Sequence, residues 1–324
     1  MKIAQIQMHV SADKAENIRH ACDLVRSAGD IDLAVLPEMF CCPYDNACFR
    51  DYGEPFAGPA QRAMSQLARE RGIYLIAGSL PELEGHRVYN TSFVYAPDGT
   101  CIARHRKIHL FDIDVEGGQR FMESEVLSPG REVTTFDTPW GTMGLCICFD
   151  MRFQELCRLM ALRGARVIFA PAAFNMTTGP AHWELLLRQR AVDNQCFTVG
   201  AAPARDEAAS YVAWGHSLIC DPWGTVLHEC GSGEETAVSL GIHVQRLTLT
   251  NMVLCCLTCS IIVSRVGLIN FIGLVAPHIV RMVVGNTPVY LIPGSVLAGA
   301  VLLLLGDLFA RVAMMPIILP IGAI

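Results

Sequence analysis

Charge is nearly absent from the last quarter of the chain. Residues 1–240 carry 21 basic and 30 acidic side chains, whereas residues 241–324 carry only Arg246, Arg265, Arg281, Asp307 and Arg311. About one charged residue in seventeen is far below the roughly 25% usual in globular proteins. Such a segment cannot cover its own surface with polar groups, so we expect it to be membrane protein. A very hydrophobic soluble core is the alternative.

The chain also lacks the marks of a secreted, metal-binding or nucleic-acid-binding protein. No CxxC pair is matched by a second, and several of the 14 cysteines lie in apolar runs, at Cys146, Cys196, Cys255, Cys256 and Cys259. Residues 1–8 alternate as a strand does and are too short for the apolar part of a secretory signal. There is no basic stripe. We therefore expect reduced thiols, a cytoplasmic location for the first part and no nucleic-acid partner.

Strand-like and helix-like segments alternate through the first 240 residues. The expected strands are Lys2–Met8, Asp32–Leu36, Tyr74–Gly78, Arg87–Tyr95, Cys101–His105, Gly141–Cys148, Val167–Pro171 and Phe197–Ala202. The expected helices are Asp13–Ser27, Pro59–Arg71, Gln154–Arg163 and Ala181–Asn194. Two segments, Pro97–Thr100 and Asp221–Gly224, have the composition of hairpin turns. This alternation predicts an α/β fold in which helices cover sheets.

Beyond Leu240 the pattern becomes that of bilayer segments. Leu247–Ser264 is 18 residues long without a charge, and Met282–Gly306 is 25 residues long without one. Both lengths suit membrane spans, which need about 20 residues. The segment Gly267–Arg281 between them is apolar but interrupted by glycine and proline. The sequence therefore predicts an α-helical transmembrane region after the α/β domain.

One cysteine stands where a nucleophile could stand. The segment Gly144–Phe153, GLCICFDMRF, predicts a buried strand that ends in Cys148 and turns sharply into a helix. A cysteine at such a turn faces a cleft, and the backbone N–H groups beside it are available to an anion. The segment alone is equally consistent with a small apolar residue that closes a core strand.

Three further charged residues stand out: Glu38 in LPEMF, Lys107 in RHRKIHLFD and Glu123 in FMES. Taken singly, each has a simpler explanation than catalysis. Glu38 could be a solvated strand end, Lys107 one charge in a basic surface run, and Glu123 a carboxylate at a helix start.

Together and in order, these segments resemble the signature blocks of the nitrilase superfamily of carbon–nitrogen hydrolases, most closely its omega-amidase branch. The resemblance covers residues 1–239. Further matching segments are Lys107–Val115, Glu123–Gly130, Phe174–Trp183, Arg190–Gln195 and Tyr211–Ser217. It implies a four-layer αββα sandwich for residues 1–239, a homodimer, a small amide as substrate, and no metal or organic cofactor.

The resemblance also implies four catalytic residues. Cys148 would be the nucleophile and Glu38 the base that takes its proton, since a thiol attacks an amide only as the thiolate. Lys107 and the backbone N–H of Phe149 would stabilise the charge that develops on the carbonyl oxygen. Glu123 would hold Lys107 in place.

Omega-amidases hydrolyse the terminal amide of small dicarboxylic acid monoamides such as 2-oxoglutaramate. We expect Arg152 to bind the substrate carboxylate, since a guanidinium can hold a carboxylate at two points; a structural pair with an acidic residue is the alternative. Tyr44 and Met176 are implied to line the pocket, whereas we expect Trp214 and His216 in the core. The alternative enzyme is another acid amidase or an N-carbamoyl hydrolase.

From about Glu234 onward the chain resembles a different family, the permease subunit of iron-siderophore and cobalamin ABC importers. The matching segments are Val238–Leu247, Gly267–Gly285 and Leu291–Gly322. The resemblance implies that residues 240–324 are a partial, membrane-inserted permease and that the hydrolase domain lacks its usual C-terminal segment. We therefore expect a chimeric reading frame. A non-functional product, or a permease fragment acting in transport, is the alternative from another class.

Overall fold

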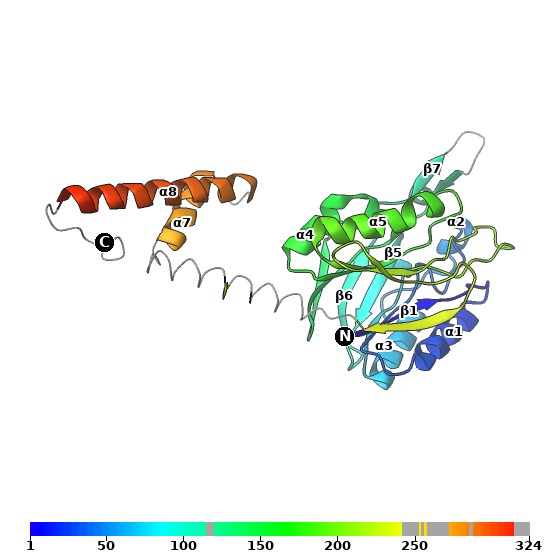
Figure 1. Ribbon diagram of the computed structural model, residues 1–324. Helices are drawn as coiled ribbons and strands as arrows, with labels where there is room; N and C mark the ends of the chain where they lie inside the picture. Colours follow the sequence, from blue (N-terminus) through cyan, green and yellow to red (C-terminus); the bar gives the residue numbers. More distant parts are fainter. Residues whose placement is uncertain (115–119, 242–252, 254–255, 258–271, 285–287, 314–324) are drawn as a thin grey trace. The chain divides into compact units, whose positions relative to one another are not determined.

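The computed structural model describes residues 1–114, 120–241, 253, 256–257, 272–284 and 288–313. The chain divides into two compact units, Met1–Val244 and Gln245–Ile324, and Figure 1 shows the elements of each. All residues expected in the active site belong to the first unit.

The first unit contains two main sheets. One has the strand order β15, β1, β2, β3, β5, β4, with β6 paired to β5. Its strands are β1 (Lys2–Gln7), β2 (Leu33–Val35), β3 (Tyr74–Ile76), β4 (Leu80–Glu84), β5 (Arg87–Tyr95), β6 (Cys101–Arg106) and β15 (Thr236–Gly241). The neighbours β1, β2 and β3 run parallel, and the other pairs are antiparallel.

The second sheet has the order β14, β13, β12, β11, β10, β9. Its strands are β9 (Thr134–Thr138), β10 (Gly141–Leu145), β11 (Val167–Pro171), β12 (Phe197–Ala201), β13 (Leu218–Cys220) and β14 (Val226–Glu229). The central strands β10, β11 and β12 run parallel. A separate hairpin pairs β7 (Asp112–Asp114) with β8 (Arg120–Met122).

The two main sheets pack face to face, with helices on their outer sides (Figure 1). Ile3, Val35 and Ile76 of the first sheet join Leu145 and Phe169 of the second in one buried cluster. The helices α1 (Lys14–Ser27) and α3 (Pro59–Arg71) cover the first sheet, and α4 (Gln154–Leu162) and α5 (Gly179–Asn194) cover the second. The short helix α2 (Asn46–Phe49) follows β2. This is the expected αββα sandwich.

Helix end signals explain why two helices agree with the sequence to within one residue. The Asp13 side chain accepts hydrogen bonds from the N–H groups of Ala15 and Glu16, which caps α1. Helix α3 begins with Pro59 and ends before Gly72, whose φ of 63° is left-handed.

The strand that precedes the cysteine is shorter than predicted. β10 ends at Leu145, and Cys148 begins a short 3₁₀ helix, η2 (Cys148–Arg152). The backbone leaves the sheet here because the N–H of Ile147 donates to the side chain of Asp150 instead of to a neighbouring strand. The prediction that the strand reaches the nucleophile is therefore wrong.

The last strand of the first unit lies where the sequence predicts the boundary between the hydrolase part and the permease part. β15 pairs antiparallel with β1, from Lys2 opposite Gly241 to Gln7 opposite Thr236. It therefore runs across the predicted boundary between residues 239 and 240. That boundary stays a prediction.

In the second unit, α7 (Ile272–Val284) and α8 (Pro288–Ala313) pack against each other. The predicted span Met282–Gly306 is divided between these two helices, and the predicted span Leu247–Ser264 lies outside the described residues except at positions 253, 256 and 257. None of the described helices combines the length and the apolar character needed to cross a bilayer. The expected transmembrane spans are not confirmed.

Candidate active site

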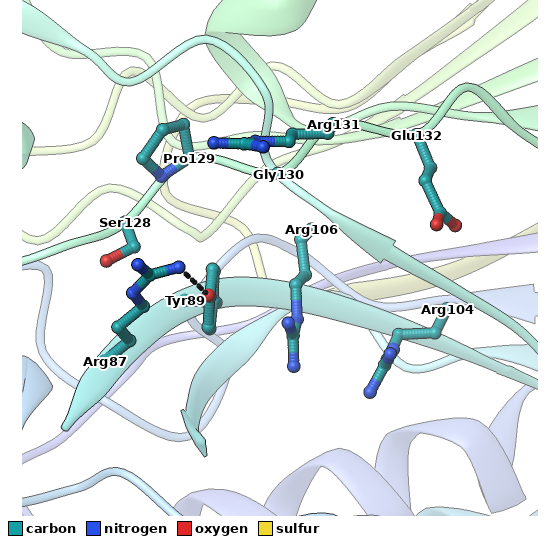
Figure 2. A pocket seen from close by; sticks show the side chains of 9 residues that line it. All are labelled: Arg87, Tyr89, Arg104, Arg106, Ser128, Pro129, Gly130, Arg131 and Glu132. Atoms are coloured by element: carbon teal, nitrogen blue, oxygen red, sulfur yellow. Dashed lines mark hydrogen bonds between the residues drawn. The ribbon is translucent and has the colours of Figure 1, made fainter. Parts of the chain in front are cut away.

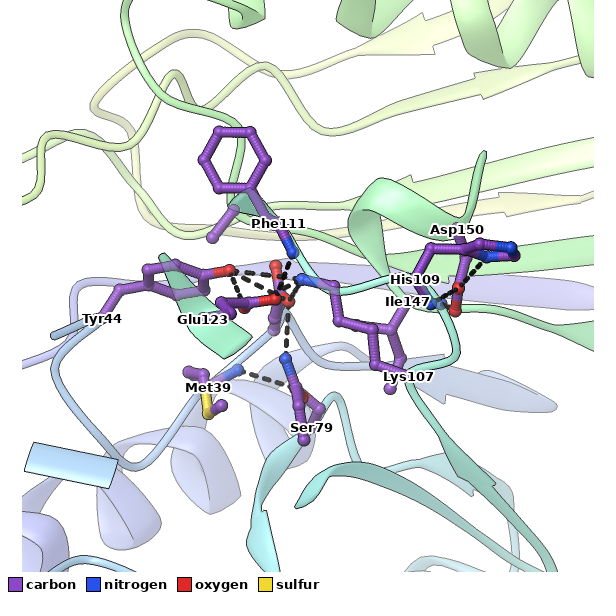
Figure 3. Close-up of polar contacts among 12 residues, drawn as sticks. Met39, Tyr44, Ser79, Lys107, His109, Phe111, Glu123, Ile147 and Asp150 are labelled. Carbon is purple, nitrogen blue, oxygen red and sulfur yellow. Dashed lines mark hydrogen bonds and ion pairs between the residues drawn. The ribbon is translucent and has the colours of Figure 1, made fainter. Parts of the chain in front are cut away.

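Lys107 is fully buried between two carboxylates (Figure 3). It follows β6, where its backbone N–H donates to the Asn90 carbonyl. Its Nζ lies 2.9 Å from Oε1 of Glu38 and 3.0 Å from Oε1 of Glu123, and donates to the Tyr44 hydroxyl at 3.3 Å. Burial by itself would lower the pKa of Lys107, but the carboxylates of Glu123 and Glu38 raise it above its ordinary value. The ammonium therefore stays charged in the protein interior.

Glu38 lies just beyond the end of β2, and 1% of it is exposed. Its Oε1 accepts hydrogen bonds from Lys107 and, at 2.8 Å, from Nδ2 of Asn90. Its Oε2 is buried and has no hydrogen-bond partner among the described residues. The backbone is strained next to it, since Met39 has a φ of 52°. One carboxylate oxygen is thus held in place and the other is available to accept a proton.

Glu123 opens the 3₁₀ helix η1 (Glu123–Glu125) and is fully buried. Its Oε2 accepts from the backbone N–H of Phe111 at 2.7 Å, and its Oε1 accepts from the Tyr44 hydroxyl at 2.5 Å as well as from Lys107. Burial raises the pKa of Glu123, and the charge of Lys107 opposes that shift. These contacts suit the expected role of holding the lysine in place.

Cys148 is 5% exposed and adopts a φ of 47°. This left-handed conformation costs a non-glycine residue on the order of 1–3 kcal/mol and is concentrated at functional sites. The pKa of its thiol is raised well above the usual value by burial and by the nearby carboxylate of Glu38, while Lys107 acts in the opposite direction. The resting thiol is therefore protonated and has a base beside it.

Asp150 ties the cysteine turn to the segment that carries Lys107. Its Oδ2 accepts from the N–H of Ile147 at 3.1 Å and contacts His105 Nε2 at 2.9 Å. Its Oδ1 accepts from the N–H groups of Ile108 and His109 at 3.2 and 2.9 Å. Burial would raise the pKa of Asp150, but the hydrogen bonds from the two histidines lower it below its ordinary value. The carboxylate fixes the position of Cys148 relative to Lys107.

A small cavity of about 10 Å³ lies against the nucleophile. It is lined by Cys148, Phe149, Arg152, Phe111, Ala173, Phe174, Thr178 and Tyr211. A second cavity, of about 70 Å³, is lined by Glu38 and Tyr44 and shares the walls Ala173 and Tyr211 with the first. The N–H of Phe149 makes no hydrogen bond to another described residue, so it is available to an oxyanion.

Arg152 is a cation without a protein anion. Its Nη2 lies 2.8 Å from Nδ1 of His182, and its buried Nε has no hydrogen-bond partner in the described part of the chain. No carboxylate of the described part of the chain forms an ion pair with it. The structural acid that was the alternative for Arg152 is thus not found among the described residues, and Arg152 lines the cavity of Cys148.

Other expected residues lie away from this cavity. Met176 is 40% exposed and lines neither cavity, so the structure does not bring it to the nucleophile. The rings of Trp214 and His216 stack on each other, Trp214 packs on the cluster beneath α4 and α5, and His216 contacts Glu229.

The volume of a pocket does not by itself identify the active site. A larger open pocket of about 490 Å³ contains none of the expected residues (Figure 2). Of its arginines, Arg104 and Arg106 are paired with Glu82 or Glu84. Among the residues that the structure describes, no group of three or more His, Cys, Asp or Glu side chains could hold a metal ion.

Three residues of the site were missed by sequence reasoning. Asn90 is a buried amide inside the strand β5, and such a polar residue in an apolar run was a usable signal. Asp150 lies two positions after Cys148 and was read only as part of the turn. Tyr211, whose hydroxyl donates to the Ala173 carbonyl at 2.6 Å, opens one of the segments that resemble the family, but no role was assigned to it.

Comparison with known proteins agrees with this geometry. Residues 2–251 match the carbon–nitrogen hydrolase family. The chain belongs to this family. The omega-amidase NIT2 of Mus musculus is 51% identical over 248 residues, covering 76% of this chain and 90% of the relative; that of Homo sapiens is 49% identical with the same coverage.

Solved structures show the same fold. The crystal structure of Saccharomyces cerevisiae Nit3, a member of branch 10 of the nitrilase superfamily, has a TM-score of 0.69 at 41% identity, covering 75% of this chain and 91% of that one. The Caenorhabditis elegans NitFhit protein has a TM-score of 0.68 at 33% identity, covering 78% of this chain and 63% of that one. Residues 223–324 match the FecCD transport family.

Substitutions of Glu38 and of Lys107 should shift the pH at which Cys148 becomes alkylated in opposite directions. Because the Glu38 carboxylate raises the pKa of the thiol and Lys107 lowers it, Glu38→Gln should move the pH profile of alkylation by iodoacetamide to lower pH. Lys107→Gln should move it to higher pH. Alkylation of Cys148 is followed by peptide mass spectrometry.

The matched control is Glu84→Gln, which removes an exposed carboxylate paired with Arg106 and should leave the profile of Cys148 in place. Unchanged profiles in both site variants would mean that neither charge acts on the thiol.

Proposed function

We propose that this protein hydrolyses the terminal amide of small dicarboxylic acid monoamides, with 2-oxoglutaramate as the type substrate, and releases ammonia. The observation that carries the proposal is that Arg152, which has no acidic partner among the described residues, lines the cavity of the Cys148 thiol. A substrate with an amide at one end and a carboxylate at the other satisfies both groups. Relatives about 50% identical carry the name omega-amidase.

The first half of the reaction forms a thioester. The Cys148 proton passes to Oε2 of Glu38 as Sγ bonds to the amide carbon. The oxyanion is stabilised by the N–H of Phe149 and by Lys107, whose longest contact, with Tyr44, is the one most easily exchanged. The carbon–nitrogen bond then breaks, and the leaving nitrogen takes the proton from Glu38 as ammonia departs.

The second half restores the enzyme. Water gives a proton to Glu38, and its oxygen adds to the thioester carbon, with the same donors at the oxyanion. The carbon–sulfur bond breaks, and the Cys148 thiolate recovers the proton from Glu38. Neither half needs an oxidant, a metal or an organic cofactor.

The test is ammonia release by the full chain from 2-oxoglutaramate and from N-carbamoyl amino acids. Cys148→Ala should abolish turnover. Arg152→Gln should raise KM for 2-oxoglutaramate by about 10- to 100-fold, because a hydrogen bond to a charged group contributes about 1.5–3 kcal/mol.

Full activity of Cys148→Ala would contradict the mechanism. Turnover of N-carbamoyl amino acids without turnover of 2-oxoglutaramate would favour the N-carbamoyl hydrolase instead. Circular dichroism of each variant controls for loss of the fold.

For the first unit, the hydrolase unit, we also propose a cytoplasmic location, because ten of its cysteines, among them the buried Cys22, Cys146 and Cys157, are free thiols. The homodimer implied by the family stays a prediction. Exposed apolar side chains on the outer helices, Leu159 and Leu162 on α4 and Leu185 and Val192 on α5, support it.

For the second unit we propose a permease-derived segment that associates with membrane. The match of residues 223–324 to a transport family supports this ancestry. Large apolar side chains on α7 and α8 are exposed, including Met282, Val283, Val296 and Leu304. Exposed apolar area of this kind requires a cover, and lipid can supply it.

The full chain should therefore float with phosphatidylcholine vesicles in a density gradient, because these side chains enter the lipid. A double variant, Leu297→Asp and Leu304→Asp, should float less, whereas Glu84→Gln on the hydrolase unit should float as the parent does. Recovery of the parent chain at the bottom of the gradient would contradict membrane association.

A further inference from the structure

Among the residues that the structure describes, the Arg152 side chain has one hydrogen-bond partner, and that partner carries no negative charge. Nη2 of Arg152 lies 2.8 Å from Nδ1 of His182, in the first turns of α5. A guanidinium can only donate hydrogen bonds, so Nδ1 must accept and the imidazole proton must sit on Nε2. His182 is therefore neutral while this contact holds. Burial and the charge of Arg152 both lower the pKa of His182, in agreement with this state.

A neutral acceptor such as His182 leaves the positive charge of Arg152 in place, which a carboxylate would not do. An aspartate or glutamate at this position would neutralise Arg152 and compete with any anion in the cavity. An imidazole fixes the direction of the guanidinium and leaves its full charge to the ligand. The buried Nε of Arg152 has no hydrogen-bond partner among the described residues, so this N–H group is available to donate to a ligand.

The surroundings restrict Arg152 from other sides. Its guanidinium carbon lies 5.2 Å from the centre of the Phe149 ring. The backbone of the η2 turn is held by Arg190, which donates from Nε to the Met151 carbonyl at 2.8 Å and from Nη2 to the Arg152 carbonyl at 3.2 Å. The backbone is thus anchored independently, and the direction of the guanidinium itself depends on His182.

We propose that His182 is the positioning residue of the substrate carboxylate site: it holds Arg152 toward the Cys148 cavity without neutralising it, and so selects amides that carry a carboxylate. This inference rests on the proposed function. His182 does not line the cavity of Cys148, so it acts through Arg152 and not on the reacting atoms.

Three substitutions of His182 distinguish an effect on the direction of the Arg152 guanidinium from an effect on its charge. His182→Ala removes the acceptor and should raise KM for 2-oxoglutaramate about tenfold, with a much smaller change in kcat. His182→Asn offers an oxygen near the position of Nδ1 and should restore most of the affinity. His182→Glu supplies a competing carboxylate and should raise KM at least as much as His182→Ala. Glu184→Gln, an exposed neighbour on α5 paired with Arg188, is the matched control.

A second measurement does not depend on the catalysed reaction. The rates at which iodoacetate and iodoacetamide alkylate Cys148 give a ratio that reports the cation beside the thiol. Relative to the parent, Arg152→Gln should lower the ratio strongly, His182→Ala should lower it less, His182→Asn should retain it, and His182→Glu should lower it to the level of Arg152→Gln.

The outcomes distinguish the two claims. If the parent chain does not hydrolyse 2-oxoglutaramate, the proposed function fails whatever the alkylation ratios are. If it does, and Arg152→Gln raises KM while His182→Ala and His182→Glu leave both KM and the alkylation ratio unchanged, the role of His182 is overturned. Rescue by His182→Asn alone excludes a merely structural effect of the alanine variant.

Discussion

The active site depends on one buried ammonium group between two buried carboxylates. Lys107 Nζ lies 2.9 Å from Glu38 and 3.0 Å from Glu123, and all three side chains are fully buried. Charges taken out of water are costly, and loss of one partner of a buried pair costs about 3–5 kcal/mol. Tyr44, Asn90 and the N–H of Phe111 satisfy the remaining oxygens except Oε2 of Glu38. That one oxygen is where the cluster can accept a proton.

The fold serves this cluster by bringing strand ends together. Glu38 follows β2, Lys107 follows β6, and Cys148 follows β10 of the opposite sheet. Two sheets packed face to face place these ends side by side, but packing alone does not set distances of a few ångströms. Asp150 does so, because one carboxylate binds the Ile147 N–H beside the nucleophile and the Ile108 and His109 N–H groups beside the lysine. The left-handed backbone of Cys148 is held by the same contacts.

Much of this could be predicted from the sequence, and the failures have physical causes. Strands and helices with clear end signals, such as Pro59–Arg71 and Val167–Pro171, agree with the structure, and the four residues Glu38, Lys107, Glu123 and Cys148 meet in one place.

The strand before Cys148 was predicted too long because its last N–H binds a side chain, which hydrophobicity does not reveal. Met176 was expected in the pocket through family analogy and is exposed instead. Asn90, Asp150 and Tyr211 act through contacts that are distant in the sequence or formed by backbone groups. The apolar run Met282–Gly306 indicated one span, whereas the structure has two helices with residues 285–287 between them.

The central claim is that Cys148 carries the acyl group during turnover, and the partition of that group between water and hydroxylamine tests it most directly. A common thioester must give the same ratio of acid to hydroxamate from every amide that shares its acyl part. The measurement compares glutaramate, a dicarboxylic acid monoamide without a ketone that hydroxylamine could attack, with its N-methyl amide at a fixed hydroxylamine concentration. We expect hydroxamate from both amides, with the same ratio of acid to hydroxamate. A ratio that changes with the leaving amine, or hydrolysis of both amides without any hydroxamate, would contradict it.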